Sequence, residues 1–373
     1  MVSVKYEGDY PPLRQNTGSE QSRKACLRGT RVPVFLFGAW RSSDGDCCSD
    51  LLCSGEKQSL LDSLLLAQWE DHALSGLLRY DVTSCETKVI DGEKGFIALL
   101  NENWNVNSFT ESQNKIQRSD CLKLDYVKAD VEDLLFCVAI GDKEGPELIP
   151  SSTVPKDGIF VVVNANPVEY GHIFMVPCKL YWPRNVIDKK SLELVTQISA
   201  EISNCSFHAF YDHLPSNSGI YFQACYFPNP LPVELMPIIS FFGEEKGIQI
   251  CELADYPIKT LVFSGKQLKS LVGVVSVICS HLESQSIPFN LLISDCGTKI
   301  FLFPQVRVLE HRNPTTWECG GFFLFKQPLG FNNATEEGIL KDLSMVSLDD
   351  EGFKELKQLC CDMAREFTAK AGV

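Results

Sequence analysis

The histidines of this chain are few, and one of the six has surroundings that suit chemistry. His172 follows Gly171 at the start of an apolar run, 173–177, and the turn before it contains Asn164 and Asn166. A histidine at such a junction can face a ligand, and apolar strands that deliver polar side chains to one edge suit a phosphate-handling pocket. The alternative, which is more common for a single histidine, is a structural side chain. We expect the others to lie on the surface or half-buried: His72, His208, His213, His281 and His311.

The elements around His172 must hold it in place. A run of strand-forming residues, 160–163, precedes the turn, and the apolar strand 173–177 follows it. A third strand, 219–227, carries Gln223. Between the last two strands a helix is predicted, because five apolar side chains recur at helical spacing: Leu192, Leu194, Val195, Ile198 and Ile202.

Other common catalytic and metal-binding motifs are missing from the sequence. It has neither a glycine-rich phosphate loop nor a Gly-x-Ser-x-Gly elbow, which excludes the usual P-loop, dinucleotide and α/β-hydrolase sites. Its 16 cysteines include no Cys-x-x-Cys pair. The cluster of Cys26, Cys47, Cys48 and Cys53 lacks a standard zinc-ligand spacing. We therefore expect reduced thiols, many of them buried, and neither a metal nor a cofactor.

The composition, with 45% hydrophobic and 22% charged residues, is that of a soluble globular protein with a substantial core. A formal net charge of -14 argues against binding to nucleic acid or to an anionic membrane, since both need basic surface. The chain turns polar directly after its start, and its longest apolar run, 271–279, is shorter than the roughly 18–20 residues of a membrane span. We expect a cytoplasmic protein, with the nucleus as a second location.

The remaining periodicities predict an α+β protein with short antiparallel strands and packed helices. We expect a flexible arm over 1–30, one half over 31–245, and a second α+β half over 246–373 that ends in a helix. Strands are predicted over 31–38, 79–82, 87–90, 95–100, 131–140 (a strand or short helix), 248–253, 258–263, 290–294, 299–303 and 322–325. Helices are predicted over 59–75, 267–284 and 351–367, and irregular connections over 143–157 and 228–237.

Several motifs resemble a known family. The spacing Asn-x-x-Pro-x-x-x-Gly-His over 164–172, followed by an apolar strand, resembles the first signature of histidine-triad nucleotide hydrolases and transferases. Longer segments are similar to the plant GDP-L-galactose phosphorylases: WED at 69–71, RYDVTSCETKVI at 79–90, PVEYGH at 167–172, PFNLLISD at 288–295 and NPTTWE at 313–318. The similarity covers about 26–367, nearly the whole chain.

The resemblance implies a histidine-triad-like α+β fold of two fused halves, related to galactose-1-phosphate uridylyltransferase. It implies GDP-hexose (GDP-L-galactose or GDP-glucose), GDP and inorganic phosphate as partners, and self-association or association with active relatives. In that family the middle histidine of a His-x-His-x-Gln strand takes up the guanylyl group; phosphate then releases GDP. Tyr221 occupies the nucleophile position here, with His172 and Gln223 as its catalytic neighbours. The nucleotide-binding residues would be Asn164, Asn166, Gly171, His172 and Gln223.

The catalytic strand departs from the family pattern, since it reads Gly219-Ile220-Tyr221-Phe222-Gln223 and lacks both histidines. A tyrosine with its ordinary pKa near 10 is only about one part in a thousand phenolate at pH 7. The loop before this strand, 211–218, is also shorter than the family pattern, and 103–107 contains no Lys or Arg. Two hypotheses remain open. Guanylyl transfer is lost or strongly impaired, leaving nucleotide binding or a partner-binding role; or the chain is a phosphorylase with altered chemistry, using Tyr221 or direct attack by phosphate assisted by His172.

Overall fold

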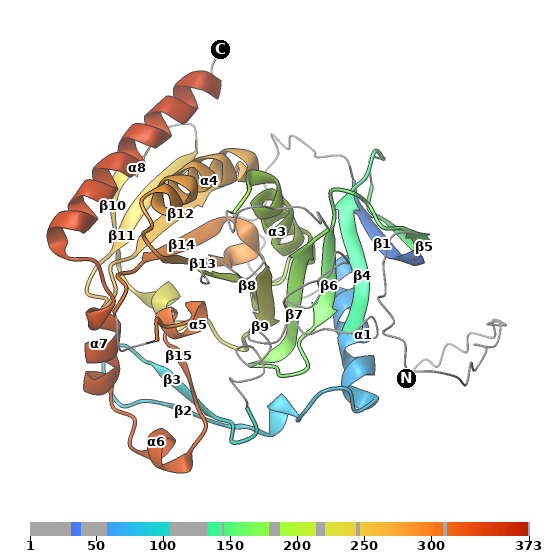
Figure 1. Ribbon diagram of the computed structural model, residues 1–373, viewed down its shortest axis with the longest axis horizontal. Helices are drawn as coiled ribbons and strands as arrows, with labels where there is room; N and C mark the ends of the chain where they lie inside the picture. The colour runs from blue at the N-terminus through green and yellow to red at the C-terminus, as the bar shows by residue number, and fades with distance from the viewer. Residues whose placement is uncertain are drawn as a thin grey trace, which may run out of the picture.

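The computed structural model of the chain describes residues 31–38, 58–104, 133–143, 145–178, 187–213, 221–243, 247–308 and 312–371 (Figure 1). The predicted arm 1–30, the cysteine cluster at 26–53, His311, and positions 219 and 220 of the catalytic strand lie outside these residues. No helix in the described ranges combines the length and the apolar character needed to cross a membrane.

Twelve strands from the described ranges form one large sheet. Neighbouring strands are antiparallel except β1 and β4, so the predicted antiparallel architecture is confirmed. In spatial order the strands are β10 (Ile238–Gly243), β11 (Ile248–Leu253), β12 (Leu261–Gly265), β14 (Lys299–Pro304), β13 (Phe289–Ser294), β8 (Phe207–Asp212), β9 (Phe222–Tyr226), β7 (Tyr170–Pro177), β6 (Ile159–Val163), β4 (Leu134–Ile140), β1 (Arg31–Phe37) and β5 (Glu147–Thr153).

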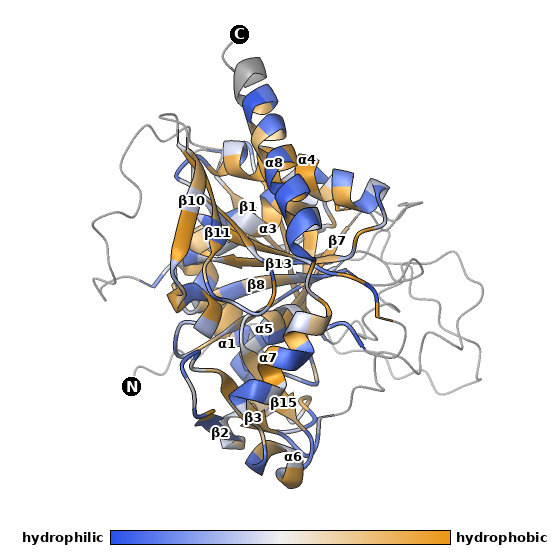
Figure 2. Ribbon diagram, turned by 90° about the vertical axis from the view of Figure 1, so that its left-hand side faces the viewer, coloured by the Kyte–Doolittle hydropathy of each residue, from blue (hydrophilic) through white to orange (hydrophobic). Residues whose placement is uncertain are grey.

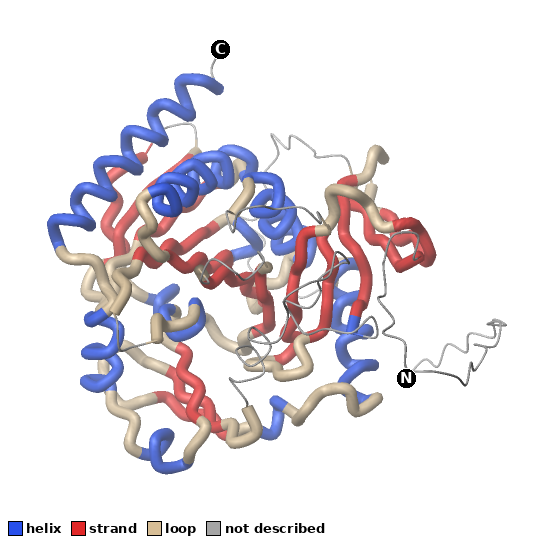
Figure 3. The backbone as a smooth tube through the Cα atoms, in the orientation of Figure 1, coloured by secondary structure: helices blue, strands red, loops and turns tan. Residues whose placement is uncertain are grey.

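Helices cover one face of this sheet, and a smaller sheet lies against the other (Figures 1 and 3). The helices are α1 (Leu60–Leu74), α3 (Lys189–Ile202), α4 (Leu268–Ser284) and α8 (Asp350–Ala371). The smaller sheet has the order β15 (Phe322–Phe325), β3 (Ile97–Leu100) and β2 (Glu86–Val89). Short helices accompany it: α5 (Thr316–Cys319), α6 (Pro328–Asn332) and α7 (Glu336–Met345).

Successive side chains of β8 point to opposite faces of the sheet, so this one strand packs into both cores. Phe207, Ala209 and Tyr211 point into the apolar core under the helices, whereas Phe210 points into the core shared with the smaller sheet. The helices carry matching apolar stripes, visible on α8 in Figure 2 as alternating orange and blue segments. Because Asp212 follows this alternation, it lies on the same face as Phe210.

Four local expectations differ from the structure. Residues 79–82 do not form a strand: the Asp81 side chain accepts the Thr83 N–H at 2.9 Å and starts the 3-10 helix η1 (Val82–Ser84). The strand expected over 258–263 is β12, Leu261–Gly265. The stretch 143–157 contains β5, and 228–237 contains the 3-10 helix η4 (Pro232–Leu235). A further 3-10 turn, η5 (Asp295–Gly297), joins β13 to β14.

Candidate functional site

The turn before His172 is held by hydrogen bonds from α1 and from the residues before η1. The Trp69 indole N–H donates to the His172 carbonyl at 3.2 Å, and the Tyr80 hydroxyl donates to the Pro167 carbonyl at 2.6 Å. Within the turn the Asn164 side-chain oxygen accepts the Asn166 N–H at 2.9 Å, which closes an Asx turn. Two of the predicted nucleotide-binding residues, Asn164 and Asn166, are therefore buried parts of the turn.

Gly171 has a conformational reason to be glycine. Its φ is +67°, in the left-handed region, and a Cβ there would lie 2.5 Å from the Tyr226 ring. The Tyr226 hydroxyl in turn donates to Asp62 on α1 at 2.7 Å, so the ring has little room to move. This close approach sets the direction in which the chain enters β7 and places His172.

Gly171→Ala is expected to lower the free energy of unfolding by about 2 to 4 kcal/mol, because it combines backbone strain with overpacking against Tyr226. Gly76→Ala is the matched control, since Gly76 also has a positive φ of +73° but has open space where its Cβ would be. The control is expected to cost about 1 kcal/mol. Urea unfolding of both variants measures the difference; equal losses would show that the Tyr226 contact is unimportant.

His172 is 1% exposed and uses both ring nitrogens. The Val168 N–H donates to Nδ1 at 2.9 Å, so Nδ1 carries no proton. Nε2 then carries the proton and donates it to Gln223 Oε1 at 3.1 Å. Burial lowers the pKa of His172 to about 4, although the bond to Gln223 opposes this. The imidazole is therefore neutral at pH 7, with a single tautomer set by its neighbours.

Gln223 connects His172 to Asp212 through a second hydrogen bond. Its Nε2 donates to Asp212 Oδ2 at 3.2 Å. Asp212 Oδ1 accepts the Thr316 N–H at 2.6 Å and the Thr316 hydroxyl at 2.7 Å. We call His172, Gln223, Asp212 and Thr316 the polar chain. The donor and the acceptor of each hydrogen bond in the polar chain are fixed, because the N–H groups of Val168 at one end and Thr316 at the other can only donate.

Asp212 is the only titratable acid of the polar chain. Burial raises the pKa of Asp212 to about 6, and the two Thr316 hydrogen bonds oppose the rise. Glu318 raises this pKa further and Arg312 lowers it, but these two side chains also pair with each other at 2.6 Å. Within the described ranges Asp212 makes no salt bridge; its hydrogen-bond donors there are uncharged.

Tyr221 lies just before β9, two residues from Gln223. It is 7% exposed and packs edge-on against Phe174 of β7, with ring centroids 5.6 Å apart. Burial, and then the Asp212 carboxylate, raise the pKa of Tyr221 well above its ordinary value near 10. The structure thus places the predicted nucleophile in an apolar cluster beside an acid, where its phenolate is disfavoured.

The second half of the chain contributes α5, which packs against the His172 side of the site. α5 begins at Thr316, where Glu318 and Thr315 form a capping box. The next residue, Trp317, packs edge-on against the His172 ring at 6.2 Å and against Phe210 at 6.1 Å. These contacts were not predicted individually, although 313–318 carries part of the family resemblance. His172 and Phe210 lie more than a hundred residues before Trp317 in the sequence, so no local sequence pattern predicts these contacts.

Four of the other histidines, His72, His208, His213 and His281, lie in the described ranges, and none of them joins the polar chain. His208 was expected on the surface or half-buried, but it is 1% exposed, with Nε2 2.9 Å from Glu234 and Nδ1 2.8 Å from the Ser206 carbonyl. The expectation was wrong because His208 lies within β8, a strand that the sequence reading missed. His213 follows β8 and stacks near Phe289 on the helix-covered face, at 5.4 Å. His72 and His281 are half-buried on α1 and α4.

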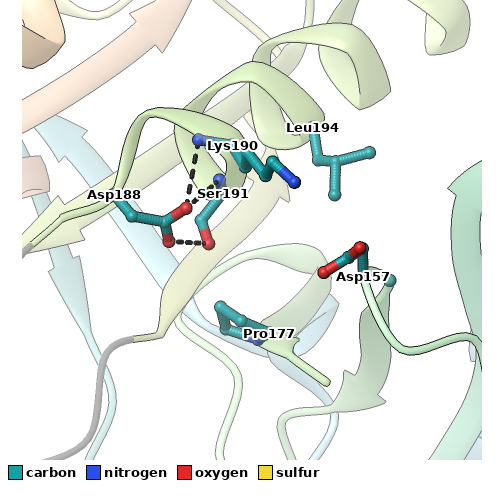
Figure 4. A pocket seen from close by; sticks show the side chains of 7 residues that line it. Asp157, Pro177, Asp188, Lys190, Ser191 and Leu194 are labelled. Carbon is teal, nitrogen blue, oxygen red and sulfur yellow. Dashed lines mark hydrogen bonds between the residues drawn. The ribbon is translucent and has the colours of Figure 1, made fainter. Parts of the chain in front are cut away.

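A shallow pocket lies at the N-terminus of α3, away from the polar chain (Figure 4). Asp157, Pro177, Lys190 and Leu194 line it, and the Asp188 carboxylate bonds Ser191 and the helix N–H groups there. The Asp188 carboxylate therefore already caps the helix N–H groups of Lys190 and Ser191 at this pocket. Nor does any group of three or more His, Cys, Asp and Glu side chains in the described part of the chain have the arrangement of a metal site.

Comparison with known proteins agrees with the geometry. The yeast Ap4A phosphorylase Apa2 superposes with a TM-score of 0.54 at 13% identity, covering 79% of this chain and 99% of that one. This likeness confirms the predicted histidine-triad-like α+β fold. Two family models match the two parts of the chain: "GDPGP1-like, N-terminal domain" over residues 60–225 and "GDPGP1-like, C-terminal domain" over residues 232–367.

Named relatives are phosphorylases of GDP-sugars. GDP-L-galactose phosphorylase 1 of Arabidopsis thaliana is 35% identical over 90% of this chain and 80% of its own length. GDP-D-glucose phosphorylase 1 of Danio rerio is 22% identical over 85% of this chain and 96% of its own length. Both family-model domains and the level of identity lead to one conclusion: the chain belongs to the GDPGP1-like family, which contains the GDP-L-galactose phosphorylases.

Proposed function

We propose that this GDP-L-galactose phosphorylase-like protein binds GDP or a GDP-hexose but has lost effective guanylyl transfer. The relatives named for GDP-L-galactose and GDP-D-glucose support the ligand class. The observation that carries the loss of transfer is the environment of Tyr221, which is buried beside Asp212 at the position where the family resemblance expects a histidine.

Guanylyl transfer needs a nucleophile with an available lone pair. The nucleophile attacks the guanylyl phosphorus, hexose 1-phosphate leaves with the bonding electrons, and inorganic phosphate then displaces the nucleotide as GDP. Neutral imidazole is abundant at pH 7 because its ordinary pKa is near 6.5. Tyr221 instead needs ionisation, and its raised pKa leaves less than about one phenolate in a thousand at pH 7.

His172 does not replace the missing nucleophile. Its Nδ1 lone pair accepts the Val168 N–H, and its Nε2 holds a proton that is donated to Gln223. A nucleophilic attack by either nitrogen would break one of these buried hydrogen bonds, at a cost of about 1 to 3 kcal/mol for the group left unpaired. The same geometry suits a positioning role, since a neutral N–H donor and the Gln223 amide are held in fixed orientation.

The test is phosphate-dependent GDP release from GDP-L-galactose and from GDP-glucose, measured beside the effect of GDP on the melting temperature. We expect release below about 0.01 per second, a thousandfold under the median enzyme at roughly 10 per second, together with a rise in melting temperature. Turnover of about 1 to 1000 per second would contradict the proposal and support altered chemistry, with direct attack by phosphate giving a single-displacement rate law. Absence of any GDP effect would leave association with proteins, including active relatives, as the function to test.

A further inference from the structure

Asp212 lies at the centre of the candidate site, and its described hydrogen-bond donors are all uncharged. Its Oδ1 accepts both hydrogen bonds from Thr316, and its Oδ2 accepts a bond from the uncharged Gln223 amide. Among the described residues, no Lys, Arg or His lies within ion-pair distance of it. As a whole residue Asp212 is half-buried, at the end of β8.

The charged and titratable groups around Asp212 come from β7, β8, the start of β9, and α5 with the residues before it. Tyr211 neighbours it on β8, and Tyr221 faces it from the start of β9. Glu318 and Cys319 face it from α5. Arg312, just before α5, lowers the pKa of Asp212, and the ion pair with Glu318 engages that guanidinium. His172 of β7 is joined to Asp212 through Gln223, and burial lowers its pKa to about 4, so it is neutral at pH 7. The tyrosines, Cys319 and Glu318 are neutral or negative when they titrate.

In the proposed function the guanylyl phosphorus would lie at Tyr221, which interacts electrostatically with Asp212, so a bound nucleotide phosphate would add negative charge beside this carboxylate. Two like charges at close range in a poorly solvated site repel strongly, so one of them is neutralised instead. The phosphate of a nucleoside diphosphate stays ionised above about pH 6. The carboxyl group is the more easily protonated of the two, because no Lys, Arg or His in the described ranges forms an ion pair with it.

We propose that Asp212 acts as a charge gate: the site accepts a nucleotide phosphate only when this carboxylate takes up a proton from solvent. This inference rests on the proposed binding of GDP and names how that binding is regulated. It makes the affinity for GDP fall as the pH rises, by about tenfold per pH unit above the pKa of the free carboxyl group. Guanosine, which carries no phosphate, should bind without this dependence.

The experiment is isothermal titration calorimetry of GDP into the full chain between pH 7.0 and 8.5, in pairs of phosphate-free buffers with low and high heats of ionisation. Over this range GDP is already ionised, so proton uptake reports the protein. We expect close to one proton taken up per GDP by the wild type, none with guanosine, and none with Asp212→Asn. Asp71→Asn removes an exposed carboxylate on α1 and serves as the matched control, with uptake equal to that of the wild type.

The outcomes separate the two ideas. GDP binding with no proton uptake and constant affinity from pH 7.0 to 8.5 would overturn the gate while the proposed function stands. If Asp212→Asn binds GDP at pH 8.5 and the wild type does not, the gate is supported, because the charged carboxylate would then be what excludes GDP from the wild-type site. No binding by either protein at any pH from 5.5 to 8.5 would overturn the proposed function and the gate with it. The wild-type proton count needs no variant, so a poorly folded Asp212→Asn leaves the test intact.

Discussion

As the pH falls, Asp212→Asn is expected to lose more stability than the wild type, and His172→Gln is expected to lose less. Between pH 7 and pH 4.5 the variant without Asp212 should lose about 2 kcal/mol more unfolding free energy than the wild type. The variant without His172 should lose about 2 kcal/mol less. Both residues belong to the polar chain, and the two effects have opposite sign because one folded-state pKa is lowered and the other is raised.

The sign of each effect depends on whether the folded or the unfolded state binds more protons. The folded pKa of His172, about 4, lies below the ordinary value of 6.5, so the unfolded chain takes up the proton first and stability falls as the pH drops through this window. The folded pKa of Asp212, about 6, lies above 3.8, so the folded protein takes up the proton first and stability rises as the pH drops from 6 toward 4. In the wild type the two contributions largely cancel.

Urea unfolding at pH 4.5, 5.5, 6.5 and 7 measures the effect as a difference between each variant and the wild type, which removes the contribution of all other groups. Glutamine at position 172 offers both an acceptor for Val168 and a donor for Gln223. Asparagine at position 212 keeps an acceptor for Thr316 but places an N–H group against the Gln223 amide, so Asp212→Asn is also expected to lose about 1 to 3 kcal/mol at every pH. Curves parallel to that of the wild type would show that neither group titrates as the structure implies.

The sequence predicts much of the fold because its interior strands and amphipathic helices have strong local patterns. The runs 160–163 and 173–177 are apolar enough to appear as β6 and β7, and the spacing around Leu192 predicts α3. The Asp-Gly turn between β2 and β3 also agrees with a hairpin. The division of the chain at 245/246 stays a prediction.

The missed strands have physical reasons. β8 is buried on both faces, so it lacks the alternation of apolar and polar residues that marks a half-buried strand. β5 contains Pro150, which reads as a loop residue but is tolerated on an edge strand, where its missing N–H is not needed. β10 is the other edge and exposes Ile238 and Ile239, so its apolar residues do not mark a buried face.

The candidate site was predictable only in part. The proximity of His172 and Gln223 follows from the pairing of β7 with β9. His172 was named from its place between a glycine and an apolar strand, and Gln223 was named from the family resemblance. Asp212 was not named, because its significance comes from Thr316, 104 residues further along, and from the Gln223 amide. Long-range polar contacts of this kind depend on strand register, which a single sequence does not report.

Tyr221→His is expected to become guanylylated when incubated with GDP-L-galactose in the absence of phosphate, at least a hundredfold faster than the wild type or Tyr221→Phe. A histidine at this position supplies a neutral lone pair at pH 7, whereas the tyrosine must first lose a proton from a buried phenol beside Asp212. Its attack on the guanylyl phosphorus forms a nitrogen–phosphorus bond and releases hexose 1-phosphate. Added phosphate should then discharge the adduct as GDP.

The measurement is intact-protein mass spectrometry with and without phosphate, and acid lability identifies the adduct, because a phosphoramidate hydrolyses in acid whereas a tyrosyl phosphodiester survives. Tyr211→Phe is the matched control, since Tyr211 is also buried and has a raised pKa but points into the helix-covered core. Labelling of the wild type that disappears only in Tyr221→Phe would make the tyrosine a working nucleophile and overturn the proposed loss of transfer. An unlabelled Tyr221→His that still binds GDP would show that nucleophile loss is not the whole cause, and that the short loop or the missing basic residues of 103–107 also block the reaction.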